Sequence, residues 1–487
     1  MSDEKRDEPF LGPRGIEQAT HTLVLWQKIA IILLILTVPA AAFMGKFTDY
    51  LFVINLVLAI FFFITTAYRV WLIDLALRKH KEIHITSLDH HNREWPRYVV
   101  QVPLYKEPRA IAKITDALSK LDYPKDRLTV QLLVEADDEE TRAAVVAADI
   151  KPPFKEVLIP VSYPRTKPKA CNVGLAQADG DYLVIYDAED RPDHDQLKKA
   201  VLAFERSEER VACIQGKLNF YNPHYNFLTR CFTAEYSLWF DFCLPGLDVL
   251  QAPIPLGGTS NHFKLDVLKE LKGWDEYNVT EDCDLGLRLF CAGYRTRVLD
   301  STTWEEACSH VPSWFRQRSR WVKGYVQTWL IHTRNPFKLL KNIGLINFIH
   351  FNILIGGSFF SQLIAPIYWV LVGMWLVAVS APSGKWPALT QFQLWLSEFF
   401  PLPVFILTAS CLFLGNFLLL YAGAAACAER RIKDLIKYSP LLPLYWQAMG
   451  YSAWKGTLQL IWKPHYWEKT QHYVEGDEDE DEHPDEP

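Results

Sequence analysis

Long apolar runs divide this chain of 487 residues and constrain what it can fold into. The first two runs cover residues 29–44 and 51–72, with Arg69 as the one charged exception. Further runs cover about 345–379 and 404–426. Each is long enough, or nearly so, to cross roughly 30 Å of hydrocarbon. We therefore expect membrane helices, with the first two forming a hairpin, rather than helices buried in a soluble core.

Basic residues mark the ends of these runs. The second run is followed by Arg78, Lys79 and Lys81, and the last by Arg430, Arg431 and Lys433. Cytoplasmic loops of membrane proteins are enriched in Lys and Arg, so both ends are predicted to lie in the cytoplasm. The polar stretch between the two sets of runs is then a cytoplasmic domain.

The remaining segments complete the expected organisation. Residues 440–462 carry polar side chains and basic flanks, which favours an amphipathic helix at the membrane interface over a full crossing. The acidic end of the chain, 475–487, is typical of a solvated, disordered tail. The predicted units are an N-terminal segment (1–24), a transmembrane hairpin (25–75), a cytoplasmic domain ending in interface helices (76–341), transmembrane and interfacial helices (342–462), a short segment (463–474) and the tail.

Composition excludes some classes of protein. The nine cysteines are scattered, without a CxxC pair or a zinc-site spacing, which indicates reduced thiols. A formal net charge of −6 gives no sign of nucleic-acid binding. The stretch 78–95 carries four histidines, but no spacing suits a metal-ligand set, so we interpret it as a linker.

The polar stretch alternates between strand and helix patterns. Apolar segments typical of strands cover 98–105, 128–138, 156–162 and 181–190, and helical patterns cover 108–121, 139–149 and 167–178. This alternation predicts an α/β domain with a mostly parallel, doubly wound sheet. Ligands of such sheets bind beyond the carboxyl ends of the strands.

Carboxylates stand at these strand ends. Asp137 and Asp138 follow the second strand, and Asp187, Glu189 and Asp190 follow the fourth. Like charges repel at close range, so such a group needs either full solvation or a cation among its oxygens. Mg²⁺ and Mn²⁺ prefer oxygen ligands, usually one or two carboxylates plus phosphates. An acidic turn facing solvent is the alternative.

Two further patterns carry chemistry. In "TEDCDLG", Thr280 is predicted to cap a helix, and Asp282 is either a capping charge or a general base. In "QRSRW", Gln317, Arg320 and Trp321 fall on neighbouring helix faces and offer groups that bind sugars and phosphates. The alternative is a basic juxtamembrane helix that grips anionic lipid through Arg316, Arg318 and Lys323.

Together these patterns resemble the membrane-embedded family 2 glycosyltransferases, the group of cellulose, curdlan and hyaluronan synthases. The segments "VEADDEET", "YDAEDRP", "TEDCDLG" and "QRSRW" occur in the family's order, between membrane helices at the expected places. The resemblance implies a GT-A fold, Rossmann-like with a mostly parallel sheet, inserted between transmembrane helices. It also implies an inverting, processive transferase in the bacterial inner membrane.

The resemblance also implies roles for individual residues. The UDP-sugar would be bound by Asp137, Asp138, Lys169, Asp187, Glu189 and Arg320. Asp187 with Glu189 or Asp190 would hold Mg²⁺ or Mn²⁺, the choice between the last two being open. Asp282, with Glu281 beside it, would be the catalytic base. The acceptor glycan would contact Gly258, Thr259, Ser260, Asn261, His262, Gln317 and Trp321, although a tight turn is the alternative for "GGTSNH". A C-terminal gating segment would include Trp467, Thr470 and His472.

The expected product is a β-linked polysaccharide, with a β-glucan from UDP-glucose as the first hypothesis. The expected partners are the donor, the growing glycan and the bilayer, with periplasmic export or accessory subunits as further candidates. Two alternatives remain: transfer of one sugar to a lipid acceptor, and a non-catalytic membrane scaffold.

Overall fold

The computed structural model describes residues 18–79, 82–85, 93–380 and 387–466. The predicted acidic tail, and Trp467, Thr470 and His472 of the predicted gating segment, lie outside the described residues.

Long apolar helices flank the central domain on both sides in sequence. Among the residues that the structure describes, four helices are long and apolar enough to cross a membrane: Leu25–Phe43 (α1), Phe47–Lys79 (α2), Pro336–Ser380 and Leu402–Glu429. The third comprises α12 (Pro336–Phe351), η5 (Asn352–Gly356) and α13 (Gly357–Ser380), and the fourth comprises α15 (Leu402–Ser410), η6 (Cys411–Gly415) and α16 (Asn416–Glu429). The chain is therefore a multi-pass membrane protein, as expected.

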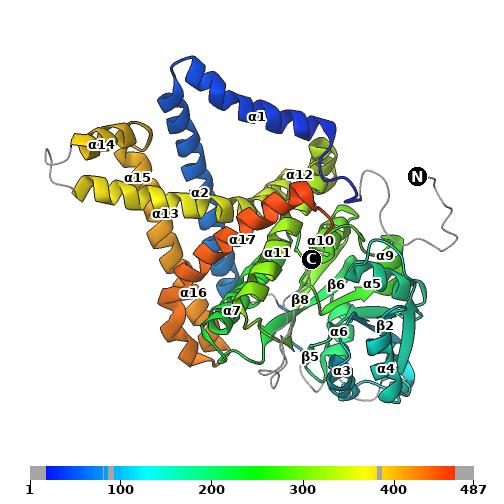
Figure 1. Cartoon of the computed structure of the whole chain (residues 1–487). Coiled ribbons are helices and arrows are strands. Elements are labelled where there is room, and N and C mark those ends of the chain that lie inside the picture. The colour runs from blue at the N-terminus through cyan, green and yellow to red at the C-terminus, as the bar shows by residue number, and fades with distance from the viewer. Residues whose placement is uncertain (1–17, 80–81, 86–92, 381–386, 467–487) are drawn as a thin grey trace.

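The expected hairpin is open in this structure. Figure 1 shows α1 diverging from α2, with its start beside the region where α11 and α12 meet. The indole of Trp26 donates to the carbonyl of Arg334 at 2.9 Å, and the amide of Gln27 donates to the carbonyl of Leu330 at 2.9 Å. The start of α1 is thus held by the helix that follows the central sheet.

The central domain is built on one eight-stranded sheet in the order β3-β2-β1-β4-β7-β6-β8-β5. The strands are β1 (Tyr98–Leu104), β2 (Leu128–Glu135), β3 (Phe154–Ile159), β4 (Tyr182–Ile185), β5 (Arg191–Pro192), β6 (Val211–Phe220), β7 (Asn261–Lys264) and β8 (Arg295–Glu305). Strands β3, β2, β1 and β4 are parallel, β6 is parallel to β8, and β7 runs antiparallel between β4 and β6. The mostly parallel sheet predicted from the sequence is confirmed.

Helices cover both faces of the sheet. One face packs against α3 (Ala110–Ser119), α4 (Glu139–Ala147) and α6 (Gln196–Glu205). The other packs against α5 (Lys167–Ala176), α8 (Leu244–Leu250), α9 (Leu265–Glu270) and α10 (Glu281–Cys291). Residues of β1 alternate between the two cores, with Val99 on the second face and Val100 on the first, as the period of a strand requires.

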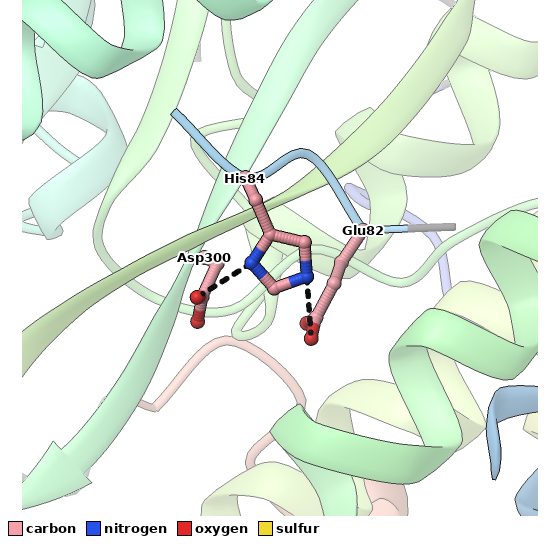
Figure 2. A group of neighbouring side chains, drawn as sticks. All are labelled: Glu82, His84 and Asp300. Atoms are coloured by element: carbon pink, nitrogen blue, oxygen red, sulfur yellow. Dashed lines mark hydrogen bonds and ion pairs between the residues drawn. The ribbon is translucent and has the colours of Figure 1, made fainter. Parts of the chain in front are cut away.

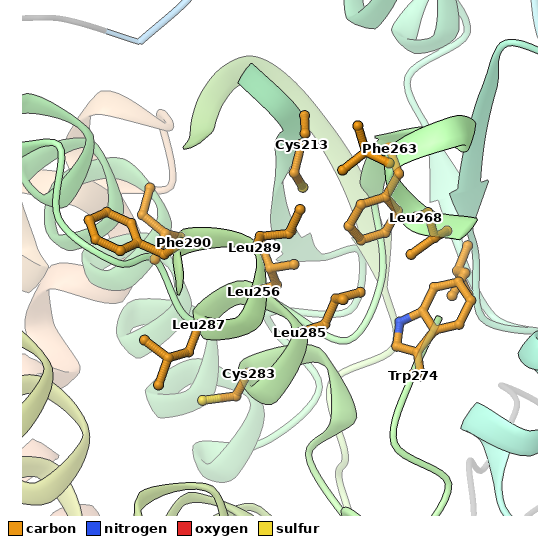
Figure 3. Packing of buried hydrophobic residues seen from close by; sticks show 14 of the residues in the cluster. Cys213, Leu256, Phe263, Leu268, Trp274, Cys283, Leu285, Leu287, Leu289 and Phe290 are labelled. Carbon is orange, nitrogen blue, oxygen red and sulfur yellow. The ribbon is translucent and has the colours of Figure 1, made fainter. Parts of the chain in front are cut away.

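Helix α10 is fixed by its apolar side. Leu285 and Leu289 are buried beside Phe263 of β7 and Trp274 (Figure 3). Burying side chains of this size stabilises the fold by roughly 1.5–3 kcal/mol each. The first turn of α10 is consequently held at a defined place relative to the sheet.

The domain and the membrane helices are tightly joined. A Cβ added to Gly246 of α8 would lie 2.3 Å from the carbonyl oxygen of Leu72 on α2. A Cβ added to Gly456 of α17 (Leu442–Trp462) would lie 2.3 Å from the carbonyl oxygen of Ser319 on α11 (Val311–His332). Such approaches require glycine. The remaining helices are η3 (Lys125–Arg127), α7 (Phe227–Leu238), η4 (Trp239–Cys243), α14 (Pro387–Phe399) and η7 (Lys433–Leu441).

The described residues 82–85 of the histidine-rich stretch after α2 contact the sheet, where Ile83 bridges to Leu299 of β8. His84 lies between the carboxylates of Glu82 and Asp300, with Nδ1 2.8 Å from the Asp300 Oδ2 (Figure 2). The ammonium of Lys217 lies 2.6 Å from Glu82 and 3.0 Å from Asp300. The linker prediction missed this network because Asp300 and Lys217 come from β8 and β6, far along the chain.

Candidate active site

One cavity of about 410 Å³ joins the sheet edge to the membrane helices. Asp187 and Glu189 line it from the end of β4, and Asp282 lines it from α10. Helix α11 contributes Gln317, Arg320 and Trp321. The acidic and basic groups that lie far apart in the sequence therefore line one cavity.

Lys167 places a positive charge beside the end of β4. Its ammonium contacts the carboxylate of Asp187 and donates to the carbonyl of Gly258 at 2.9 Å. Burial acts to lower the pKa of Lys167, but the charges of Asp187 and Glu281 outweigh it and raise that pKa. Lys167 is thus charged, and sequence reasoning missed it because only the fold shows which lysine at the start of α5 faces the cavity.

Asp190 and Glu189 have different surroundings. Asp190 is 1% exposed, and its Oδ2 accepts hydrogen bonds from the backbone of Asp187 at 2.8 Å and from the hydroxyl of Thr259. Glu189 lines the cavity. Asp190 therefore stabilises the loop after β4 through these hydrogen bonds, whereas Glu189 faces the cavity in which a ligand would lie.

The first turn of α10 presents Asp282 to the cavity. Its Oδ1 accepts from the backbone N–H of Cys283 at 2.7 Å, and burial raises its pKa. Burial, followed by the charge of Asp282, raises the pKa of Glu281 to about 8. Near pH 7 the pair therefore retains a proton. The predicted side-chain cap is wrong, because the buried Oγ1 of Thr280 has no hydrogen-bond partner in the described part of the chain.

Arg320 faces this carboxylate pair. Burial lowers the pKa of Arg320, opposed by the charges of Glu281, Asp282 and Asp187. An arginine stays protonated at any physiological pH, so the cavity holds a positive charge near these acidic residues.

Arg318 supports the aromatic wall of the cavity. Its guanidinium makes a two-pronged ion pair with Glu235 of α7, with Nη1–Oε1 at 3.0 Å, and donates to the hydroxyl of Tyr445 at 2.6 Å. It lies 4.6 Å from the ring centroid of Trp321, which also stacks on Tyr236. The lipid-gripping alternative is wrong for Arg318, which is 4% exposed.

Lys323 is likewise turned inward. It is fully buried, and its ammonium donates to the carbonyl of Tyr466 at 2.7 Å. It therefore anchors the chain just beyond α17 and does not contact lipid. His465 lies 3.2 Å from the carbonyls of both Tyr277 and Thr20. The last described residues thus touch the loop before α10.

The segment "GGTSNH" divides between cavity and core. Gly258 lines the cavity, and a Cβ there would lie 3.6 Å from Asp282 Oδ2. The next four residues, Thr259, Ser260, Asn261 and His262, are buried and bond inside the protein to Asp190, Thr303, the Gly257 carbonyl and Tyr98. Burial lowers the pKa of His262 to about 3, so its ring is neutral. An acceptor in the cavity would meet Gly258, not these four side chains.

Three of the six residues predicted to bind the UDP-sugar, Asp137, Asp138 and Lys169, do not line the cavity. Asp137 is half-exposed and forms an ion pair with Arg165 at 2.6 Å. Asp138 caps α4 by accepting from the backbone of Thr141 at 3.2 Å. Lys169 is buried and donates to the carbonyls of Pro160 and Ser162, so it organises the loop after β3. Of the carboxylates of Asp137 and Asp138, that of Asp137 is the more exposed to solvent.

The cavity continues between the membrane helices. It is lined there by Tyr68 and Arg69 of α2, Trp369 of α13 and Asn416 of α16. Arg69 donates to the hydroxyl of Ser358 at 3.5 Å. A charged residue in a membrane helix usually faces a polar cavity or a functional path. Flat aromatic rings beside polar groups provide a surface suited to a sugar chain.

Two family models match the chain. The model described as "Glycosyl transferase family 2" matches residues 99–263, and "Glycosyl transferase family group 2" matches 182–420. Together they span the whole sheet domain and its junction with the membrane helices. The chain belongs to the family 2 glycosyltransferases. The expected GT-A fold and the expected enzyme class are thereby confirmed.

Three curated relatives are similar to this glycosyltransferase. They are the probable glycosyltransferase YdaM of Bacillus subtilis (27% identical over 53% of this chain and 62% of that protein), the beta-monoglucosyldiacylglycerol synthase of Synechocystis (28%, 52% and 54%) and the probable glucomannan 4-beta-mannosyltransferase 15 of Arabidopsis thaliana (28%, 49% and 45%). The alignments thus span about half of each relative. A solved structure, the mannosyltransferase PcManGT of Pyrobaculum calidifontis in complex with GDP-Man and Mn²⁺, is 19% identical, covers 85% of this chain and 99% of its own, and has a TM-score of 0.48.

Proposed function

We propose that this glycosyltransferase polymerises a sugar from a UDP-sugar donor into a β-linked polysaccharide and passes the product outward between its membrane helices. The observation that carries the proposal is the continuity of the cavity, which holds Asp187 and Asp282 at one end and Arg69 and Trp369 at the other. A glucan made from UDP-glucose is the first hypothesis. The relative named as a glucomannan mannosyltransferase supports a polymeric product.

The proposed chemistry is inverting transfer. Asp282 accepts the proton of an acceptor hydroxyl as that hydroxyl attacks C1 of the donor sugar. Arg320, which lines the same cavity, neutralises charge on the departing diphosphate. General-base assistance of this kind contributes about 10²- to 10⁴-fold in rate.

Asp187 and Glu189 are the residues suited to hold Mg²⁺ or Mn²⁺. Both line the cavity with carboxylate oxygens, the donor type these ions prefer, and the Lys167 ammonium already lies against Asp187 as a cation would. When bound, the divalent ion supplies charge neutralisation to the diphosphate.

The proposed orientation sets the catalytic domain in the cytoplasm of a bacterium, with the spans in its inner membrane. Arg78 and Lys79 end α2 on the domain side, and Arg430 and Arg431 follow α16. The Arg430 guanidinium pairs with Asp241 of η4, which ties that end of α16 to the domain. The positive-inside rule then assigns this side to the cytoplasm.

The deciding experiment supplies the purified protein in lipid with labelled UDP-glucose, UDP-N-acetylglucosamine or GDP-mannose and Mn²⁺. We expect a long product from one donor, sensitive to a β-specific glycosidase. Transfer of a single sugar into the organic-extractable fraction would instead support the lipid acceptor that the Synechocystis relative is named for. Absence of transfer from every donor would refute the proposal.

A further inference from the structure

Glu305 is the last residue of β8 and lies beside the loop after β4. Strand β8 pairs antiparallel with β5, where Arg191 faces Trp304. The next position along this ladder sets Glu305 opposite Asp190. Glu305 lines the same cavity as Asp187 and Glu189. The sheet thus brings one more carboxylate, from a strand far along the chain, to the acidic group at the end of β4.

Glu305 lies mainly among other carboxylates: the charges of Asp190, Glu189 and Asp187 act on it, and the ammonium of Lys167 opposes them in part. Its half-buried carboxylate has no hydrogen-bond or ion-pair partner among the residues that the structure describes. The adjacent Glu306, by contrast, accepts from the hydroxyl of Tyr221 at 3.3 Å. An acidic side chain held against other carboxylates is costly unless a cation lies between them.

A second atom in this group also lacks a partner. Asp190 is 1% exposed and uses Oδ2 for two hydrogen bonds, but its Oδ1 has no partner in the described part of the chain. Buried polar atoms without a partner are rare in folded proteins and often mark an ion or a water. Carboxylate oxygens are the ligands that a hard divalent cation prefers.

We propose that Glu305 is a further ligand of the divalent cation, so that the ends of β4 and β8 hold it together. This inference rests on the proposed function for the presence of the ion at Asp187 and Glu189. It has a consequence of its own. A site with only two carboxylates depends on phosphate oxygens to complete its shell, whereas a third carboxylate lets the ion bind before the nucleotide arrives.

The test measures Mn²⁺ binding to the purified, full-length protein in detergent without nucleotide, by the EPR signal of free Mn²⁺. We expect Glu305→Gln to weaken binding about tenfold or more. The matched control is Glu306→Gln, which changes the neighbouring glutamate and is expected to bind Mn²⁺ as the unaltered protein does. Asp187→Asn gives the baseline for a disrupted site.

Equal Mn²⁺ affinity in Glu305→Gln and the unaltered protein would overturn the inference. If Glu305→Gln fails to fold, as judged by gel filtration, Glu305→Asp retains the charge on a shorter arm and is still expected to weaken binding. Unchanged affinity in Glu305→Asp would then count against the inference. If the protein transfers sugar but Glu305→Gln binds Mn²⁺ as tightly as the unaltered protein does, this inference alone is refuted. A Glu305-dependent Mn²⁺ site in a protein that transfers no sugar would refute the proposed function alone.

Discussion

Gly324 of α11 lies directly against Thr280, the residue before α10: a Cβ at position 324 would be 2.3 Å from both Oγ1 and Cγ2 of the threonine. This contact joins the helix that carries Arg320 and Trp321 to the turn that presents Asp282. The distance between the proposed base and the aromatic wall is therefore set by a glycine, because any larger side chain would force the two elements apart.

We predict that Gly324→Ala lowers transferase activity at least tenfold and lowers the free energy of unfolding by about 1–3 kcal/mol, the usual cost of overpacking. Activity in lipid and thermal unfolding in detergent measure the two effects. The matched control is Gly373→Ala in α13, where a Cβ would meet nothing within 4 Å. Its activity and stability should stay unchanged.

A double-mutant cycle identifies the contact as the cause. Thr280→Gly removes the atoms that a Cβ at 324 would meet, and it removes no side-chain hydrogen bond of Oγ1 within the described structure. The double variant should therefore recover part of the activity lost in Gly324→Ala. Additive losses in the double variant would show that the damage arises elsewhere.

Asp282→Asn is predicted to bind the donor but to turn over 10²- to 10⁴-fold more slowly, since an amide cannot accept the acceptor's proton. Binding of labelled UDP and single-turnover kinetics separate the two effects. Normal product output from this variant would exclude Asp282 as the base. Loss of UDP binding together with turnover would point to a structural role instead.

The pH dependence of kcat/KM gives a separate test of the same residue. Burial raises the pKa of Asp282 above the ordinary aspartate value of about 3.9. As the pH falls, Asp282 therefore loses its base form at a pH above about 3.9. We therefore expect kcat/KM to decline on the acid side at a pH higher than that.

Glu281, with a pKa of about 8, carries a proton near neutrality, so Glu281→Gln should retain most of the activity at pH 7. A large loss in Glu281→Gln at pH 7 would contradict this protonation state.

The alternation of strands and helices predicted much of the sheet domain, because each strand carries its own local signal. The pattern placed Asp187 at the end of a strand and Asp282 in the first turn of a helix, and the structure has both there. Strand ends of a parallel sheet meet at one edge, so local signals were enough to predict that Asp187 lies at a ligand-binding edge. The sequence connected Asp282 to that edge only through the family resemblance.

Other parts of the site depend on contacts that no local pattern reveals. Glu305 reaches Asp190 only through the antiparallel pairing of β5 with β8. Arg318 and Lys323 follow a basic, membrane-proximal pattern, but Glu235 and the carbonyl of Tyr466 compensate them inside the protein. The sequence therefore predicted lipid contacts for Arg318 and Lys323, whereas partners from distant elements bind both side chains inside the protein.

Glu235→Gln is predicted to weaken acceptor use more than donor use. The amide leaves the buried Arg318 without its counter-charge, and a broken buried ion pair costs about 3–5 kcal/mol. Arg318 then no longer holds Trp321 in place, so the KM for added oligosaccharide acceptor should rise while binding of UDP stays unchanged. Glu140→Gln, an exposed glutamate on α4, is the control. Equal acceptor kinetics in both variants would refute the supporting role of Arg318.

Lys217→Met is predicted to destabilise the junction between the sheet and the membrane helices. The buried ammonium compensates Glu82 of the linker at 2.6 Å, Asp300 of β8 at 3.0 Å and Asp241 of η4 at 3.4 Å. Without it, the carboxylates of Glu82 and Asp241, which are largely buried, and the half-exposed carboxylate of Asp300 lose a shared counter-charge, which we expect to cost on the order of 3 kcal/mol. Lys120→Met removes an exposed ion pair with Asp116, worth at most about 1 kcal/mol, and is the control for thermal unfolding in detergent. Equal unfolding temperatures for the two variants would show that the network contributes no more than a surface pair.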